Sequence, residues 1–302
     1  MSGTHEVLGR PVARAPWRAL RLGLRHGSER GWALAFLVPY AAVFVAFVLY
    51  PVANALWMGR SPTLYAELID DPHYLRTVVN TALFTGVGVN LMMFAALLLS
   101  GLFMRRRWWI RATLVVFILP WALPAIPAFL SFHWMLIGEQ GLLNSLLSEL
   151  FAIEGPIWFN DRWLALGADI VAYVWKWLPF WTVILLAGRM AIPQELEDAA
   201  AVDGATGVRR FVHLTVPLLS NLYLVCTLLA TIWTVADFAT VFYVSGGAPA
   251  QSTDVLAVIG VRYAFDIARP PLGVAAALSA LPVLIPLVVV LMRRLQTRGV
   301  QL

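Results

Sequence analysis

Six long apolar stretches constrain the fold of this chain more than any other feature of its sequence. Five of them contain no charged residue: 31–59, 77–104, 112–137, 211–236 and 270–292. The sixth, from about Leu164 to Ala187, is interrupted only by Asp169 and Lys176. Each has at least the roughly 20 residues with which a helix crosses about 30 Å of hydrocarbon while satisfying its own backbone polar groups. Only 13% of the 302 residues are charged, so the sequence predicts an all-α polytopic membrane protein with six transmembrane helices.

Prolines lie inside several of these stretches, most densely in LPWALPAIP, Leu119 to Pro127. Membrane helices tolerate such prolines because neighbouring helices can satisfy the carbonyls that proline leaves free. We therefore keep 112–137 as one span.

The arginines predict the orientation of the six spans. Of the 21 arginines, 16 lie before the first span, between the second and third, between the fourth and fifth, and after the sixth. Cytoplasmic loops carry the excess of basic residues, so both termini are predicted to be cytoplasmic. The run 31–59 is too long for a cleaved signal peptide and is read as a retained anchor. The predicted organisation is a basic cytoplasmic segment 1–30, a six-helix transmembrane domain 31–295 and a cytoplasmic tail 296–302.

One charged segment, ELEDAAAVDGATGVRRFVHLTVP (Glu195 to Pro217), lies in the predicted cytoplasmic loop 190–217 between the fourth and fifth spans. Pro193 and the acids that follow suit the first turn of a helix. The alanines keep helix propensity high with little bulk, and Gly204 allows a turn. We predict a short helix, a glycine turn and a second helix leading into the fifth span. The alternative is an ordinary loop; we favour a docking element for a cytoplasmic partner.

The spacing of this segment resembles the cytoplasmic motif of the inner-membrane permeases of binding-protein-dependent ABC importers. That motif is glutamate-alanine-alanine, three residues, glycine, nine residues, then isoleucine, any residue and leucine-proline. Here Asp198-Ala199-Ala200, Gly204, Leu214, Val216 and Pro217 occupy these places, with three conservative replacements. Other segments are similar to the maltose-transporter type of sugar permease: Leu49-Tyr50-Pro51, Asp71-Pro72, Asn80-Thr81, Ser245 to Pro249, Tyr263-Ala264-Phe265 and Gly273 to Ser279.

The resemblance, over about residues 33–295, implies an importer subunit in a bacterial inner membrane. It implies a second permease subunit, a homodimer of ATP-binding cassette subunits, a periplasmic solute-binding protein and membrane lipid as partners. The residues that it places at the ATPase contact are Glu197, Asp198, Ala199, Ala200, Asp203, Gly204, Arg209 and Pro217. The chain has no GxxxxGK[ST] phosphate loop, so ATP and Mg²⁺ are expected on the partner ATPase and no cofactor on this chain.

Ionisable residues inside the membrane usually mark a pathway. Lys176 lies near the middle of the fourth span, with Asp169 nearer its outer end, and Asp237 lies in the outer half of the fifth. Lys176 and Asp237 could form a structural ion pair or face a cavity. The resemblance implies a sugar site formed by Tyr173, Lys176, Trp177, Phe180, Thr234 and Asp237. Lys176 also suggests a cargo with a sulfonate, phosphate or carboxylate group, although a neutral sugar or polyol stays open.

Several alternatives remain. One is a self-contained secondary transporter or channel with an ion relay through Asp169, Lys176 and Asp237, which would not need the charged cytoplasmic segment. Another is an ABC permease for a non-sugar solute. No Ser/His or Glu/His helix pair indicates an enzyme or a catalytic residue, and the histidines and the single cysteine have no metal-ligand spacing. The basic residues gather between apolar runs, so nucleic acid is not expected as a partner. The outer segment Ser252 to Pro271 is either an amphipathic helix that contacts a binding protein or a packed cap.

Overall fold

The computed structural model describes residues 29–105 and 107–299, and within these ranges the chain is helical without any strand. It divides into two compact units, residues 1–54 and 55–302. Residues 1–28 of the predicted basic segment, and residues 300–302 of the predicted tail, lie outside the described part.

The first unit contains most of the first span, Ala35–Met58, in which no side chain is buried. It is formed by α1 (Glu29–Phe44), the π-helical turn η1 (Val45–Leu49) and α2 (Tyr50–Met58), which continues into the second unit. The wide turn precedes Pro51, and the Tyr50 N–H bonds to Val45 O, five residues back. Proline clashes with the carbonyl four residues before it, and a π turn relieves that clash. The same pattern recurs before Pro217, in η2 (Phe211–Thr215).

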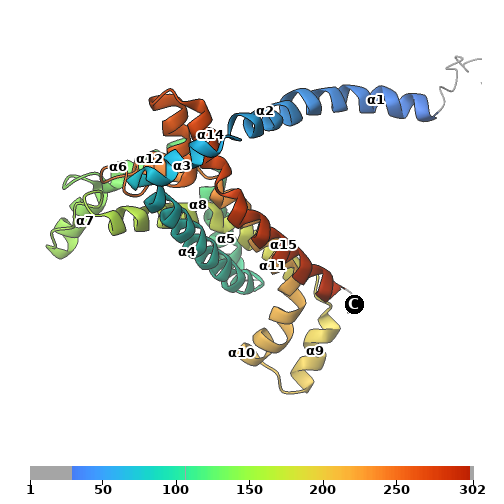
Figure 1. The fold of residues 1–302 in the computed structure, drawn as a ribbon. Helices are drawn as coiled ribbons and strands as arrows, with labels where there is room; N and C mark the ends of the chain where they lie inside the picture. The colour runs from blue at the N-terminus through green and yellow to red at the C-terminus, as the bar shows by residue number, and fades with distance from the viewer. Residues whose placement is uncertain (1–28, 106, 300–302) are drawn as a thin grey trace, which may run out of the picture. The chain divides into compact units, whose positions relative to one another are not determined.

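The second unit contains the other predicted spans (Figure 1). They are α4 (Pro72–Phe103), the pair α5 (Trp108–Ala122) and α6 (Ala125–Leu136), α8 (Arg162–Met190), α10 (Gly207–Arg210) with η2 and α11 (Val216–Val235), and α14 (Pro270–Leu278) with α15 (Leu281–Gly299). Shorter helices are α3 (Pro62–Asp70), α7 (Leu142–Phe151), α9 (Gln194–Val202), α12 (Ala239–Val244), α13 (Leu256–Val261) and η3 (Arg262–Asp266). Each predicted apolar stretch therefore coincides with a helical region.

The third stretch differs from its prediction as a single span. It is bent by 97° between α5 and α6, and the described residues give six spans only if this bent pair counts as one. The break at Leu123 and Pro124 falls within the proline-rich segment, where proline prevents the regular hydrogen-bond ladder from continuing.

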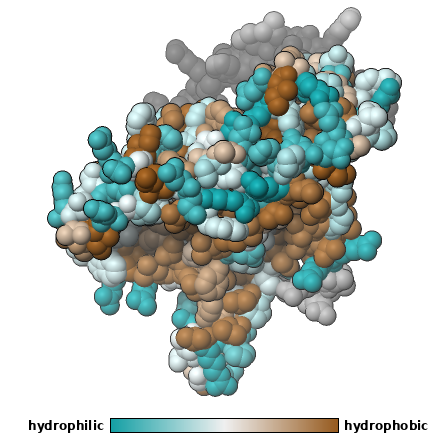
Figure 2. Space-filling model, turned by 60° about the vertical axis from the view of Figure 1, so that its left-hand side comes forward, coloured by the Kyte–Doolittle hydropathy of each residue, from teal (hydrophilic) through white to brown (hydrophobic). Residues whose placement is uncertain are grey.

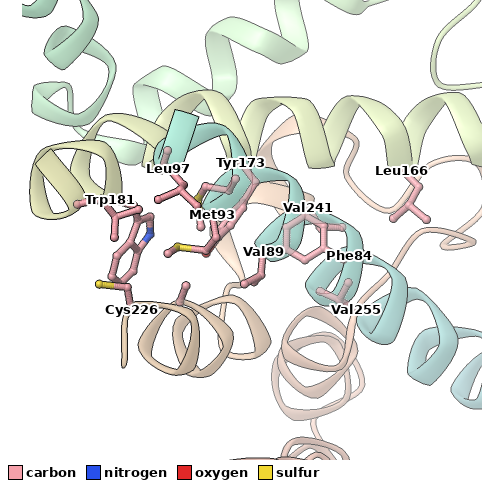
Figure 3. Packing of buried hydrophobic residues seen from close by; sticks show 14 of the residues in the cluster. Phe84, Val89, Met93, Leu97, Leu166, Tyr173, Trp181, Cys226, Val241 and Val255 are labelled. Carbon is pink, nitrogen blue, oxygen red and sulfur yellow. The ribbon is translucent and has the colours of Figure 1, made fainter. Parts of the chain in front are cut away.

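The core forms where α4 packs along α8, with α11 closing one side. Figure 3 shows Phe84, Val89 and Met93 of α4 against Tyr173 and Trp181 of α8. Trp181 and Phe84 are fully buried. Gly188 allows α11 to approach α8 closely, because a Cβ at this position would collide with Leu222. Close packing of large side chains holds these helices in one arrangement.

In the outer segment Ser252 to Pro271 the first part is packed, whereas residues 265–271 are exposed, so contact with a binding protein stays a prediction. Leu256, Ile259 and Tyr263 are buried in the packed part and belong to the same cluster as Leu272 of α14. Asn80 of α4 donates to the carbonyls of Ser252 (2.8 Å) and Asp254 (2.9 Å), and Arg262 pairs with the Asp254 carboxylate at 2.8 Å. Burial raises the pKa of Asp254, and the neighbouring Arg262 opposes that rise.

Candidate functional site

The charged cytoplasmic segment folds as a helix, a glycine turn and a second helix, as predicted. Pro193 is the N-cap of α9, and Glu195 and Glu197 lie in its first turn. After α9 the N–H groups of Gly204 and Ala205 bond to Ala201 O (3.1 Å) and Ala200 O (2.8 Å), the pattern of a Schellman motif. Gly204 has φ +74°, and a Cβ there would meet nothing within 4 Å. The backbone conformation of the turn therefore favours glycine at position 204, and not a lack of space for a side chain.

This coupling element, α9 with the turn and α10, projects from one end of the second unit (Figure 1). Val202 is 88% exposed and Val208 78% exposed, and Arg210 pairs with Glu197 at 3.5 Å across the two helices. Figure 2 shows hydrophobic and hydrophilic residues side by side on this lobe. Asp198, Ala199, Asp203 and Arg209 are exposed, whereas Glu197 and Ala200 are half-buried. Pro217 lies apart from them, in the first turn of α11.

Arg189, in the last turn of α8, connects the base of the coupling element to two spans. Its Nη2 donates to Leu97 O of α4 at 2.8 Å, and its Cζ lies 5.3 Å from the centre of the Phe211 ring in η2. Gly101 leaves room for the guanidinium, because a Cβ there would lie 2.9 Å from Nη1. In the sequence, Arg189 contributed only to the predicted orientation of the spans. Its bond to Leu97 O could not be predicted, because the two residues are 92 positions apart.

Four of the six predicted cargo residues meet between α8 and α11. Thr234 donates its hydroxyl hydrogen to Ala230 O, so Tyr173 donates to Thr234 Oγ1, at 2.7 Å, and both side chains are buried. Trp177 and Phe180 lie against Trp233, with ring centres 6.3 Å and 5.7 Å from it. We call these three rings, together with Trp121, the aromatic wall. Trp233 is 46% exposed, so the wall has an open side.

Two tryptophans of this wall were not among the predicted site residues. Trp121, at the end of α5, lies 5.7 Å from Phe180, and Trp233 precedes the predicted Thr234. Trp233 could have been found from its position one residue before Thr234, but Trp121 could not, because only the break after α5 brings it here. The indole N–H of Trp177 is buried and has no partner among the described residues.

Lys176 and Asp237 do not form the ion pair that was one of the two predicted alternatives. Lys176, 2% exposed, donates from Nζ to the carbonyls of Pro120 (2.8 Å), Trp121 (3.1 Å) and Leu123. Asp237 instead accepts from the Thr240 N–H at 2.9 Å, and Asp169 from Ser245 Oγ at 2.8 Å. In residues 29–105 and 107–299, no carboxylate lies within 4 Å of Lys176.

The break between α5 and α6 explains why Lys176 has these partners. In an uninterrupted helix, Pro120 O and Leu123 O would accept from residues 124 and 127, but both are prolines and have no N–H. The ammonium supplies three donors at a helix C-terminus, where the dipole also favours positive charge. Lys176 therefore completes the hydrogen bonds of the broken span.

The comparisons with known proteins agree with this architecture. Residues 92–301, more than two thirds of the chain, match the family described as the binding-protein-dependent transport system inner membrane component. The chain belongs to this family.

Relatives of this permease are transport proteins of similar length. It is 34% identical to the sulfoquinovosyl glycerol transport system permease protein SmoG of Agrobacterium fabrum, over 76% of this chain and 79% of that one. It is 31% identical to the trehalose/maltose transport system permease protein MalF of Thermococcus litoralis, over 75% and 81%. It is 30% identical to the sn-glycerol-3-phosphate transport system permease protein UgpA of Yersinia pseudotuberculosis, over 77% and 83%.

A solved structure has the same fold as the permease. It is a chain of a bacterial ABC transporter involved in the import of the acidic polysaccharide alginate, with a TM-score of 0.75 over 89% of this chain and 96% of that one. The sequence identity is 18%, so this likeness concerns the fold alone. The permease is thus a multi-pass inner-membrane transport component and not an enzyme, as predicted.

Proposed function

We propose that this permease is a transmembrane subunit of an ATP-driven importer. It would carry a carbohydrate or carbohydrate derivative from a periplasmic binding protein to the cytoplasm by alternating access. Two copies of an ATPase subunit would bind ATP and Mg²⁺, and a second permease subunit would complete the pathway. Use of a binding protein agrees with the family to which the chain belongs.

The observation that carries this proposal is the exposed coupling element. Val202 and Val208 present apolar side chains to the surroundings at the tip of a short, internally bonded helix pair. Exposed apolar groups of this kind mark contact surfaces, and a helix in a groove is a common way to dock. Arg189 joins the base of the element to α4 and α8. A movement imposed on α9 by nucleotide-driven closure would therefore reach α8, which carries Trp177 and Phe180 of the aromatic wall.

The aromatic wall supports a carbohydrate cargo. Trp177, Phe180 and Trp233 offer ring faces to the apolar face of a pyranose, and Trp233 is open to one side. The hydroxyl pair of Tyr173 and Thr234 lies on the same two helices and can bond to sugar hydroxyls when the helices separate. One relative is a trehalose/maltose permease.

Exchange of Gly204 for valine tests the coupling element. The left-handed conformation of residue 204 costs a side chain with a Cβ roughly 1–2 kcal/mol, so the turn should unwind. In proteoliposomes with the partner subunits, we expect Gly204→Val to bind the ATPase weakly and to lose most ATP-dependent uptake. Gly138→Val is the matched control, because Gly138 has φ +57° and open space but lies in the outer loop between α6 and α7.

Two outcomes would contradict the proposal. One is normal uptake and normal ATP turnover by a Gly204→Val variant that is inserted like the wild type. The other is gradient-driven uptake by the purified chain without any ATPase, which would favour the self-contained transporter.

We further propose that the cargo carries an anionic group. The support comes from the relatives, whose names include sulfoquinovosyl glycerol and sn-glycerol-3-phosphate. The unpartnered indole N–H of Trp177 can donate to a sulfonate or phosphate oxygen once the wall opens. Paired uptake assays with a sulfonated sugar and its neutral parent test this point. We expect uptake of the sulfonated sugar to exceed that of the parent, and the reverse preference would rule the anionic cargo out.

A further inference from the structure

Helix α7, between the third and fourth spans, has one apolar row that the protein does not cover. Leu142, Leu146 and Leu150 recur every four residues and are 53%, 42% and 69% exposed. Phe151, the last residue of the helix, is 67% exposed and lies about 100° further around it than Leu150. Ser148, about 160° around the helix from Leu146, lies on the polar side, and Glu149 lies at the edge of that side beside Leu142; both are exposed. A helix of this kind, with a separate apolar side and polar side, is typical of a boundary between hydrocarbon and water.

Asn144 fixes the direction in which this apolar row points. It is 5% exposed, and its Nδ2 donates to the carbonyls of Gly138 and Pro156, each at 3.0 Å. Its Oδ1 accepts from the indole of Trp158 at 2.9 Å. At about 100° per residue, Leu142 and Leu146 lie roughly 160° around the helix from Asn144. The hydrogen bonds of Asn144 therefore join α7 to the segments before and after it, and the leucine row faces away from these segments.

The position of α7 in the chain indicates what contacts the leucine row. The helix begins six residues after α6 ends and is followed by α8 at Arg162, so it lies between the outer ends of two spans. Figure 1 shows α7 reaching sideways beside α6 and α8, far from α9 and α10. Trp134 of α6 and Trp163 of α8 are 65% and 60% exposed near these ends, and tryptophan there is typical of the interface between membrane and water. The leucine row thus continues the lipid-facing surface of the spans.

We propose that α7 lies in the outer membrane interface, with its leucine row among the acyl chains and with Ser148 and Glu149 in water. Lipid fits this face better than a polar partner, because the row contains no charged or hydrogen-bonding side chain. The helix has no lysine or arginine, so binding would rest on apolar contact and not on anionic headgroups. In this position α7 would hold the outer ends of the broken third span and of α8 at a fixed depth.

Spin labels on neighbouring positions of α7 test this proposal. Cys226 is the one cysteine of the chain and is buried, so Cys226→Ala provides a background for single cysteines. A nitroxide is attached to Leu146→Cys or, as the matched control, to Ser148→Cys in the complex reconstituted into lipid vesicles. We expect collisions with lipid-soluble oxygen to dominate at position 146, and collisions with a water-soluble nickel chelate to dominate at position 148. If Leu146→Cys does not insert, Leu150→Cys reports on the same row.

Three results would overturn the proposal. Equal access of the nickel chelate to both positions would place the row in water. Exclusion of both reagents from position 146 would show that another subunit covers it. Immobilisation of the label at position 146 on addition of the binding protein would make the row a protein-docking surface.

Discussion

At the scale of single residues, the hydrogen bonds of Lys176 explain how a proline-rich span can break inside a membrane. Pro124 and Pro127 remove two backbone donors, and the Lys176 ammonium bonds to the carbonyls that they leave free. The sequence shows that prolines free carbonyls and that neighbouring helices can satisfy them. It does not show which residue does so, because that depends on the crossing of α5 and α8. The predicted ion pair with Asp237 is thus wrong, and Lys176 is a donor to backbone carbonyls, while its contact with cargo stays a prediction.

Replacement of Lys176 by methionine should destabilise the permease. Each buried acceptor left without a partner costs about 1–3 kcal/mol, and three carbonyls lose the same donor group. We expect Lys176→Met to lower the melting temperature in detergent and to reduce uptake of sulfonated and neutral sugars alike. Thr182→Val is the control, because its buried hydroxyl bonds only to Leu178 O on its own helix. An unchanged melting temperature with selective loss of the sulfonated sugar would instead assign Lys176 to the cargo.

At the scale of elements, apolar length predicted the spans, while the break in the third span was not predicted. A 97° bend leaves the composition of 112–137 unchanged, so a hydropathy argument cannot detect it. The coupling element was predictable because Pro193, the alanines and Gly204 each have a local conformational preference. Helices such as α12 and α13 have six residues each and pack through long-range contacts. They are too short for a helical period of hydrophobic residues to predict them. The pairing of Tyr173 with Thr234 likewise needs α8 and α11 side by side.

At the scale of the whole second unit, α8 connects the coupling element to the aromatic wall. Its 29 residues run from Arg162, which follows the Asp161 cap, to Met190, and Arg189 lies 13 residues beyond Lys176, about 20 Å at 1.5 Å per residue. Arg189 also bonds to Leu97 O, so α4 and α8 share one attachment at the inner end. A displacement of α9 should therefore move both helices together, because Phe211 and Leu97 contact the same guanidinium.

Arg189→Met should therefore separate ATP hydrolysis from transport. The variant keeps most of the side-chain volume but loses the hydrogen bond to Leu97 O and the cation over the Phe211 ring. Because the coupling element itself is unchanged, we expect the ATPase to bind normally while the cargo imported per ATP hydrolysed falls severalfold. Arg293→Met is the matched control, since it removes an exposed arginine from the C-terminal part of α15. Arg189→Lys, which retains the charge without the planar donor geometry, should give an intermediate ratio. Equal cargo-to-ATP ratios in wild type, Arg189→Met and Arg293→Met would show that movement reaches α4 and α8 by another contact.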